Sequence, residues 1–401
     1  MSVPHMTVVI PTRDRADVFR WSLQTSLQQT YPNMTILVSD NLSDGRTAEI
    51  VKEANDPRIR YVNTGRRLSM TGNYEFALSH VEEGWVTIVG DDDGLLPEAL
   101  FRVAEIIKAT GVDAVRSDVC LYRWPSLMQS EFGTLSVPLN GEDFEIRTSS
   151  EWLSRVMSGR ARYPNLPMLY SGGFVNTAVI NDLRKRRGSF YHSSIPDVYS
   201  AMALASVLDK YAYAFRPFAI DGVSKHSIGT SLVGKTPDSS AVKKFFTEEN
   251  LPWHPSVPAD AEGRVPRVHQ AWLYESYLQS GFLRNGWEVT SPLHQIEVTI
   301  SDPDIDPVGM EWAKQLASMN GLDFEAIVRG QKFPRLKRKM NKQLVRSSKA
   351  AKTYYIIGDR ENPVSNVFEA SLAAGDLLER RPGTGEVLGR LAQKALHKIA
   401  S

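Results

Sequence analysis

Cysteine is almost absent from this sequence. The 401 residues contain a single one, Cys120, so the chain can form neither an internal disulfide nor a cysteine-based zinc site. Cys120 lies in the stretch 113–122, whose pattern is typical of a strand. We therefore expect it to be a small buried hydrophobic side chain without a chemical role.

Long apolar runs and an excess of charge of one sign are also missing. No run of about 18 apolar residues is present, so we expect no membrane-spanning helix. The sequence does not open with charged residues followed by an apolar stretch, so we expect no signal peptide. We therefore expect the protein in the cytoplasm. The formal net charge is +1, which gives no reason to expect nucleic acid as a partner.

The length indicates two domains, because 401 residues are more than one compact core usually serves. In the first part short apolar runs alternate with helical patterns, which is typical of an α/β sheet. Later the strand signals fade, and helical patterns follow at 268–282, 310–319 and 387–399. We predict an α/β domain over 1–235 and a mainly helical domain over 236–401.

The first part reads as a series of buried strands joined by helical crossovers. The expected strands are 7–10, 35–38, 59–62 and 85–89, and the expected helices are 15–29, 47–54 and 69–81. Such crossovers place the loops that follow the strands along one edge of a parallel sheet, where ligands bind in open α/β folds. Three polar loops fall on that edge, at 11–14, 39–44 and 90–94.

Three successive carboxylates, Asp91, Asp92 and Asp93, follow the fourth expected strand. Like charges so close together repel one another and usually require a cation. Mg²⁺ and Mn²⁺ prefer oxygen ligands and often link carboxylates to substrate phosphates, and a departing diphosphate needs that neutralisation. The alternative is a solvated turn or helix cap, in which Asp and Gly are common.

Four segments together resemble, in order and spacing, the motifs of family-two glycosyltransferases. They are 8–13, 38–44, 72–73 and 88–97, within a likeness that covers roughly residues 5–230. The resemblance implies a GT-A fold, which is Rossmann-like with a mostly parallel sheet. It also implies inverting displacement at the anomeric carbon and a nucleoside diphosphate leaving group.

The resemblance further implies roles for single residues in a nucleotide-sugar site. Thr12 and Asp40 match positions that line the nucleobase pocket. Asp92 would be the metal ligand, although Gly90 stands where many members carry a first aspartate, so the choice among the three acids stays open. For Asn73, packing of its helix is an alternative to donor contact. The implied site consists of Pro11, Thr12, Arg13, Asp40, Arg67, Asn73, Asp91 and Asp92.

Inversion by direct displacement also requires a base that takes the proton of the acceptor hydroxyl. The resemblance implies an Asp or Glu at the start of a helix, well after the acid cluster. Asp197 fits, since it follows Pro196 and precedes a helical pattern. The alternative is a stabilising role at the helix N-terminus, where Asp is a favoured cap.

A second loop of interest lies near the end of the first part. We expect His226 to act as a late metal ligand, with Asp92 and Asp93, or to contact the diphosphate, and a purely structural histidine is the alternative. Lys225 beside it is a candidate phosphate partner. Gly222 and Gly229 would permit the loop to open and close over the donor.

Two segments of the helical part suggest partners. The stretch 332–352 is rich in Lys and Arg, and a basic amphipathic helix of this kind can rest on the inner face of a membrane that carries anionic lipid; a solvated helix face is the alternative. The aromatic stretch 272–277 is interpreted as core or as a homodimer contact.

The sequence thus predicts an inverting glycosyltransferase of the hexosyltransferase type, assisted by Mn²⁺ or Mg²⁺. The donor would be a UDP-sugar, or a GDP- or dTDP-sugar, and the acceptor a hydroxyl of a glycan, a lipid-linked glycan or a small glycoside. A non-catalytic binding module with a degenerate donor site is the first alternative. A nucleotidyltransferase is the second, although 11–15 lacks the glycines of a phosphate loop.

Overall fold

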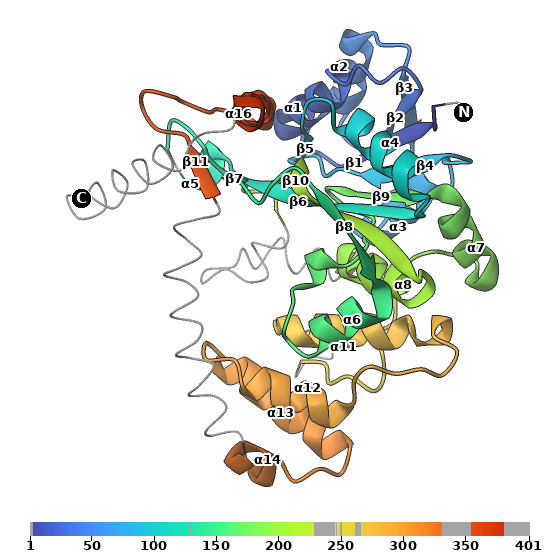
Figure 1. Cartoon of the computed structure of the whole chain (residues 1–401), viewed down its shortest axis with the longest axis vertical. Coiled ribbons are helices and arrows are strands. Elements are labelled where there is room, and N and C mark those ends of the chain that lie inside the picture. Colours follow the sequence, from blue (N-terminus) through green and yellow to red (C-terminus); the bar gives the residue numbers. More distant parts are fainter. Residues whose placement is uncertain are drawn as a thin grey trace.

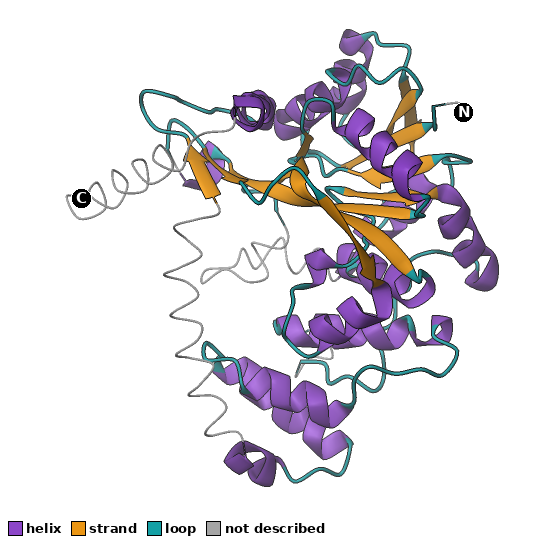
Figure 2. Cartoon of the chain, in the orientation of Figure 1, coloured by secondary structure: helices purple, strands orange, loops and turns teal. Residues whose placement is uncertain are grey.

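The computed structural model describes residues 3–128, 130–227, 245, 247–248, 251–260, 266–330 and 354–380. Within these ranges a large mixed sheet with helices on both faces forms one part of the molecule (Figure 1). The other part is built mainly of helices, as the colouring by secondary structure shows (Figure 2).

The expected parallel strands are present at the N-terminal end. They are β1 (Met6–Thr12), β2 (Met34–Asp40), β3 (Ile59–Asn63) and β4 (Trp85–Ile88), in the spatial order β4-β1-β2-β3 and all parallel. The crossovers are α1 (Ala16–Leu27), α2 (Arg46–Ala54) and α3 (Met70–Leu78). The strands and helices predicted for this stretch are therefore confirmed to within a few residues.

The rest of the sheet mixes directions. Its strands are β5 (Gly94–Leu95), β6 (Ala114–Arg123), β7 (Thr134–Pro138), β8 (Phe144–Thr148), β9 (Gly173–Asn176) and β10 (Lys210–Val223). β10 runs parallel to β6 and antiparallel to β5 and β8, and β9 lies antiparallel between β4 and β6. The helices of this stretch are α4 (Ala99–Thr110), α5 (Pro125–Met128), α6 (Ser149–Met157), the 3₁₀ turn η1 (Tyr163–Asn165), α7 (Thr177–Arg187) and α8 (Pro196–Val207).

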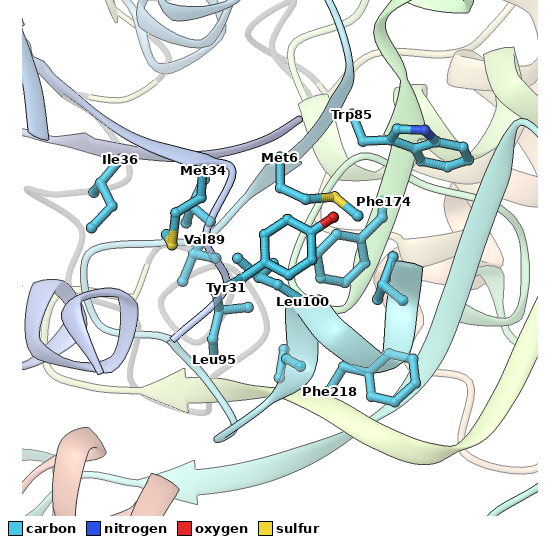
Figure 3. Close-up of a cluster of buried hydrophobic side chains, with 14 of the residues drawn as sticks. Met6, Tyr31, Met34, Ile36, Trp85, Val89, Leu95, Leu100, Phe174 and Phe218 are labelled. Atoms are coloured by element: carbon cyan, nitrogen blue, oxygen red, sulfur yellow. The ribbon is translucent and has the colours of Figure 1, made fainter. Parts of the chain in front are cut away.

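Because side chains alternate in direction along each strand, the sheet contributes to two hydrophobic clusters, one on each face. Met6, Val8 and Ile10 of β1 belong to the cluster that α1 and α4 cover, whereas Val9 belongs to the cluster on the opposite face. Successive side chains of a strand point to opposite faces, so a continuous apolar run serves both. Figure 3 shows the first cluster, in which Tyr31 and Phe174 lie close to Met6. The predicted α/β fold class is confirmed.

The helical part packs on α6 and α8 rather than on the sheet itself. It consists of α11 (His269–Gln279), η2 (Gly281–Leu283), α12 (Pro292–Ile300), α13 (Pro307–Met319) and α14 (Phe324–Gly330). α11 and α13 confirm two of the predicted helices. Trp272 and Tyr277 of the aromatic stretch are buried in this core.

Two later elements return to the sheet. β11 (Tyr354–Ile357) pairs with β7, and α16 (Val367–Arg380) packs on α1, where Gln28 Nε2 donates to Ser371 Oγ at 2.8 Å. The stretch after residue 235 therefore contributes to both parts of the molecule, and the division at 235 remains a prediction. The predicted helix 387–399, the basic stretch 332–352 and Gly229 lie outside the described residues.

Across the part of the chain that the structure describes, the helices are too short or too polar to cross a bilayer.

Candidate functional site

The loops after β1 and β4 meet at Asp91. Thr12 Oγ1 donates to Asp91 Oδ2 at 2.9 Å, and Arg15 Nη1 lies 3.0 Å from Asp91 Oδ1. Burial raises the pKa of Asp91, and Arg15 opposes that shift. Burial also works against the charge of Arg15, but Asp91 and Asp92 outweigh it and raise the Arg15 pKa above its ordinary value. The predicted meeting of these two loops at one sheet edge is observed, and it includes a cation that the sequence did not single out.

Asp92 is surrounded by hydroxyl groups from the loop after β10. Its Oδ2 accepts hydrogen bonds from Ser224 Oγ at 2.6 Å and Ser227 Oγ at 2.7 Å. Its backbone carbonyl accepts from Trp124 Nε1 at 3.0 Å. The side chain is buried, and one carboxylate with two neighbouring hydroxyls provides the oxygen-rich surroundings that Mg²⁺ and Mn²⁺ prefer.

Asp93 has different surroundings, because both of its carboxylate oxygens accept backbone N–H groups. Gly90 N donates to Oδ2 at 3.0 Å and Gly222 N donates to Oδ1 at 2.6 Å. Burial raises the pKa of Asp93 well above its usual value, and the charges of Asp92 and Asp221 add to the rise. Asp93 thus joins the acid loop to β10, an arrangement that fits a structural carboxyl better than a metal ligand.

Gly222 is required where β10 passes the acid loop. A Cβ atom at this position would lie 1.7 Å from the backbone oxygen of Asp92, which no side chain can tolerate. The glycine predicted to serve as a hinge is therefore a point of close backbone contact.

His226 is directed to α1 and not to the acid cluster. Its Nε2 lies 3.1 Å from Asp17 Oδ2, and Lys225 Nζ lies 3.4 Å from the same oxygen. The His226 carbonyl accepts from Arg15 Nη2 at 2.7 Å. Although burial works against the charge of Asp17, its contacts with His226 and Lys225 lower its pKa. Asp17 is thus the acid that attracts both side chains.

The predicted metal ligands Asp92, Asp93 and His226 are consequently not brought together as a set. Among the described residues, no group of three or more His, Cys, Asp or Glu side chains is arranged to hold a metal ion. Of the three, Asp92 alone combines a place in the acid loop with displaceable hydroxyl partners.

Asp40 and Asn73 lie at the end of β2 and in α3. Asp40 is buried, and its carboxylate accepts from Ser43 N at 2.9 Å and from Tyr61 Oη at 2.6 Å. Asn73 Oδ1 accepts from Ser39 Oγ at 2.7 Å. The Asn73 contact attaches α3 to β2, which is a packing contact with a strand rather than with the acid loop.

The remaining predicted nucleotide contacts occupy the rim of the same edge. Pro11 is paired in register with Ser39 and is buried in β1. Arg13 Nη1 lies 2.5 Å from Glu248 Oε2, and Arg67 Nη2 lies 2.7 Å from Asp14 Oδ2. Both arginines are therefore close to the site but are paired with carboxylates.

Asp197 is the second residue of α8, after Pro196. The cap residue of α8 is Ile195, whose side chain makes no capping hydrogen bond. Asp197 Oδ2 accepts from Tyr163 Oη at 2.7 Å. Burial raises the pKa of Asp197, and hydrogen bonds from Tyr163 and from the backbone at Val198 and Asp197 oppose the rise. The carboxylate thus contacts both Tyr163 and the first turn of α8, so it serves the helix terminus as well.

Asp221 and Tyr74 connect the surroundings of Asp197 with those of the acid loop. Burial raises the pKa of Asp221, opposed by Arg116, and the charge of Asp197 adds to the rise. Tyr74 is buried, and burial together with the charges of Asp93, Asp197 and Asp91 raises its pKa. No motif points to Asp221, Tyr74 or Tyr163, since an isolated Asp or Tyr in a strand, helix or turn carries no sequence signal.

Residues 7–126 match the sequence model of the family described as "Glycosyl transferase family 2". The chain is 26% identical over 109 residues to the "Succinoglycan biosynthesis protein ExoO" of Rhizobium meliloti (strain 1021), covering 27% of this chain and 31% of that protein. It is 30% identical over 101 residues to the "GalNAc(5)-diNAcBac-PP-undecaprenol beta-1,3-glucosyltransferase" of Campylobacter jejuni subsp. jejuni serotype O:2, covering 24% and 33%. The match therefore spans about a third of the length of either relative.

Among solved structures, the chain is similar to residues 1–349 of S. aureus TarS in complex with UDP-GlcNAc. The TM-score is 0.47 with 15% sequence identity, over 83% of this chain and 92% of that one.

Proposed function

We propose, from the match of residues 7–126 to the sequence model of glycosyl transferase family 2, that the chain is a glycosyltransferase of this family. In this proposal it transfers a sugar from a nucleoside-diphosphate sugar to an acceptor hydroxyl with inversion. The observation that carries the proposal is the hydrogen bond of 2.9 Å between Thr12 Oγ1 and Asp91 Oδ2. It joins the loop expected to hold the nucleotide to the acid loop expected to face the diphosphate.

The donor side would use the edge formed by β1, β2 and β4. Asp40 lies at the end of β2 in a position to accept a hydrogen bond from a nucleobase once Tyr61 turns aside. Arg13 and Arg67 flank this edge, and a nucleotide would replace Glu248 and Asp14 as their partners. A UDP-sugar is the first donor to test, followed by GDP- and dTDP-sugars.

The acceptor side would use Asp197. The acceptor oxygen forms the new bond to the anomeric carbon as the bond from that carbon to the diphosphate oxygen breaks. The acceptor proton passes to the Asp197 carboxylate, as general base catalysis requires. The electron pair of the broken bond leaves with the diphosphate, whose developing charge Arg15 is placed to offset because it lies between Asp91 and the His226 carbonyl.

A divalent ion would be held through Asp92, with the hydroxyls of Ser224 and Ser227 as neighbouring oxygen atoms. Mn²⁺ or Mg²⁺ there would supply further neutralisation of the diphosphate. The acceptor class we propose is a glycan, lipid-linked glycan or small glycoside.

The test begins with calorimetric titration of UDP, GDP and dTDP into the full chain, with and without Mn²⁺. Binding of one nucleotide that is lost in Asp92→Asn and retained in Asp197→Asn is expected. If no nucleotide binds the unaltered chain under any metal condition, the donor proposal fails.

Turnover then separates sugar transfer from its alternatives. The matching sugar nucleotide is incubated with the chain and with Asp197→Asn, and free nucleoside diphosphate and pyrophosphate are measured. Acceptor-dependent release of nucleoside diphosphate, lost in Asp197→Asn, is the expected result. Pyrophosphate release would favour a nucleotidyltransferase, and binding without turnover would favour a binding module.

A further inference from the structure

Three buried side chains donate hydrogen bonds to the backbone of the turn that contains Tyr163. Arg116 Nε donates to the Pro164 carbonyl at 2.8 Å. Arg147 Nη1 donates to the Asn165 carbonyl at 3.2 Å, and the Tyr211 hydroxyl donates to the same oxygen. Two guanidinium groups and a phenol thus contact the backbone of η1, whose three residues have Tyr163 at their start. Arg116 also donates to the Ser171 carbonyl, and Arg147 Nε donates to Glu145 Oε1 at 2.6 Å.

This arrangement is energetically demanding. Arg116 and Arg147 are 2% and 5% exposed, and a charged group buried this deeply requires well-placed partners. Arg147 lies between the rings of Trp152 and Tyr213, 3.6 and 3.4 Å from their centres. The carbonyls of η1 are part of the partner sets of both guanidinium groups, and these contacts hold the turn in place.

What η1 carries toward the site is the Tyr163 hydroxyl, which donates to Asp197 Oδ2 at 2.7 Å. This hydrogen bond holds one carboxylate oxygen, Oδ2. The backbone at Val198 and Asp197, in the first turn of α8, also hydrogen-bonds the carboxylate, so Tyr163 is the side chain that orients it beside the helix terminus.

We propose that Tyr163 is the positioning residue for Asp197, and that Arg116, Arg147 and Tyr211 hold Tyr163 in place for that purpose. The inference rests on the proposed function, in which Asp197 is the base. Tyr163 touches neither the anomeric carbon nor the leaving group; it acts by stabilising the ionised form of Asp197 and by holding its Oδ2 in place.

The other titratable and charged groups near Asp197 and Tyr163 come from four elements and the segments beside them. They are Tyr74 of α3, Arg116 of β6, Asp221 of β10, His269 of α11, Arg162 before η1 and Tyr191 before α8. The His269 ring lies 5.8 Å from the Tyr163 ring, measured between centres. None of these groups is changed by removing the Tyr163 hydroxyl, so its effect can be isolated.

The variant Tyr163→Phe removes one oxygen atom and keeps the ring. A hydrogen bond donated to a carboxylate favours the charged form, so its loss is expected to raise the pKa of Asp197 by about one unit. The acid limb of the transfer rate against pH is expected to move upward by the same amount, while nucleotide affinity stays unchanged.

Tyr31→Phe is the matched control. It removes the same atom from a buried tyrosine whose hydroxyl donates to the Pro4 carbonyl at 2.7 Å and contacts neither η1 nor Asp197. It is expected to lower the thermal midpoint without moving the acid limb. A uniform loss of rate in Tyr163→Phe with no movement of the limb, or the same movement in both variants, would overturn the proposal.

The titration of Asp197 is followed independently of turnover by carbon NMR of chain labelled at the aspartate carboxyl carbons, with Asp197→Asn used for assignment. An upward shift in Tyr163→Phe alone supports the positioning role. If that shift appears in a chain that transfers no sugar, the proposed function fails while the relation between the two residues stands. If the chain transfers sugar but the Asp197 resonance titrates identically in both variants, the positioning role fails alone.

Discussion

Arg15 and Asp91 form an ion pair of 3.0 Å between Nη1 and Oδ1, at the place where the loops after β1 and β4 meet. The Asp91 side chain is 5% exposed and that of Arg15 is 27% exposed. The pair therefore lies mostly out of water, where removal of one partner leaves an uncompensated charge. Through its second nitrogen Arg15 also holds the His226 carbonyl, so one side chain connects α1, the acid loop and the loop after β10.

Replacing Arg15 by Met is expected to lower the free energy of unfolding by about 3 kcal/mol, because Asp91 loses its cation. Nucleotide binding is expected to weaken at least about tenfold, since the loop after β10 loses its tie to the acid loop. Denaturant titration and calorimetry measure the two effects. Arg20→Met, on the exposed side of the same helix, is the control, and equal effects of the two changes would show that the pair does not matter.

Asp92→Asn and Asp93→Asn are expected to separate binding from stability. Asparagine at position 93 offers one carbonyl oxygen where two backbone N–H groups need acceptors, so it should destabilise the fold by about 1–3 kcal/mol. It should leave metal-dependent nucleotide binding largely intact. Asparagine at position 92 should abolish metal-dependent nucleotide binding and leave the stability of the fold largely intact. Thermal midpoints and calorimetry with Mn²⁺ decide the matter, and loss of metal dependence in both variants would restore Asp93 as a ligand.

Gly222→Ala is expected to displace the acid loop, because the added Cβ would overlap the Asp92 carbonyl oxygen. We expect a loss of nucleotide affinity together with a drop in thermal midpoint. Gly330→Ala, in α14, meets nothing within 4 Å and should change neither quantity. An alanine at 222 that behaves like the one at 330 would contradict the close approach of β10 to the acid loop.

Glu275 of α11 is 1% exposed and accepts hydrogen bonds from Ser193 Oγ at 2.5 Å and Gln279 Nε2 at 2.8 Å. Burial raises its pKa from 4.5 to about 7. The pKa of Glu275 is higher in the folded state than in the unfolded state, so the protonated carboxyl favours folding. Its contribution to the free energy of unfolding is complete below pH 4.5 and is lost as the pH rises to about 7. The size of the change is about 3 kcal/mol.

Glu275→Gln should remove this part of the pH dependence. Free energies of unfolding are measured at pH 5 and pH 8 for the unaltered chain, for Glu275→Gln and for Glu311→Gln, whose side chain is exposed on α13. The decline toward pH 8 should become smaller in the first variant only. An equal decline in all three would place the titration elsewhere.

The parts of the fold that can be predicted from the sequence are those that short stretches of residues determine. The strand at 85–89 and the acid loop after it could be recognised because an apolar run ends in three carboxylates. Asp197 could be placed at the start of a helix because proline precedes it. The Tyr163 contact, 34 positions away, and the pairing of β7 with β11 depend on how distant segments meet, and no local pattern encodes them. The contact of His226 with Asp17, 209 positions earlier, is not encoded locally for the same reason.

β11 and α16 pack on the sheet although they come late in the chain, and this restricts the order in which the protein can fold. Ser371 Oγ donates to the Leu95 carbonyl at 2.7 Å, across 276 positions of the chain. During synthesis the edge of β7 and the apolar surface beside it emerge from the ribosome long before the segments that cover them. A strand edge without its partner is a template for association with other chains, and contacts this distant in sequence form slowly. Closure of the sheet by β11 and α16 therefore follows the formation of the strands that they cover, and until then the open edge of β7 favours aggregation.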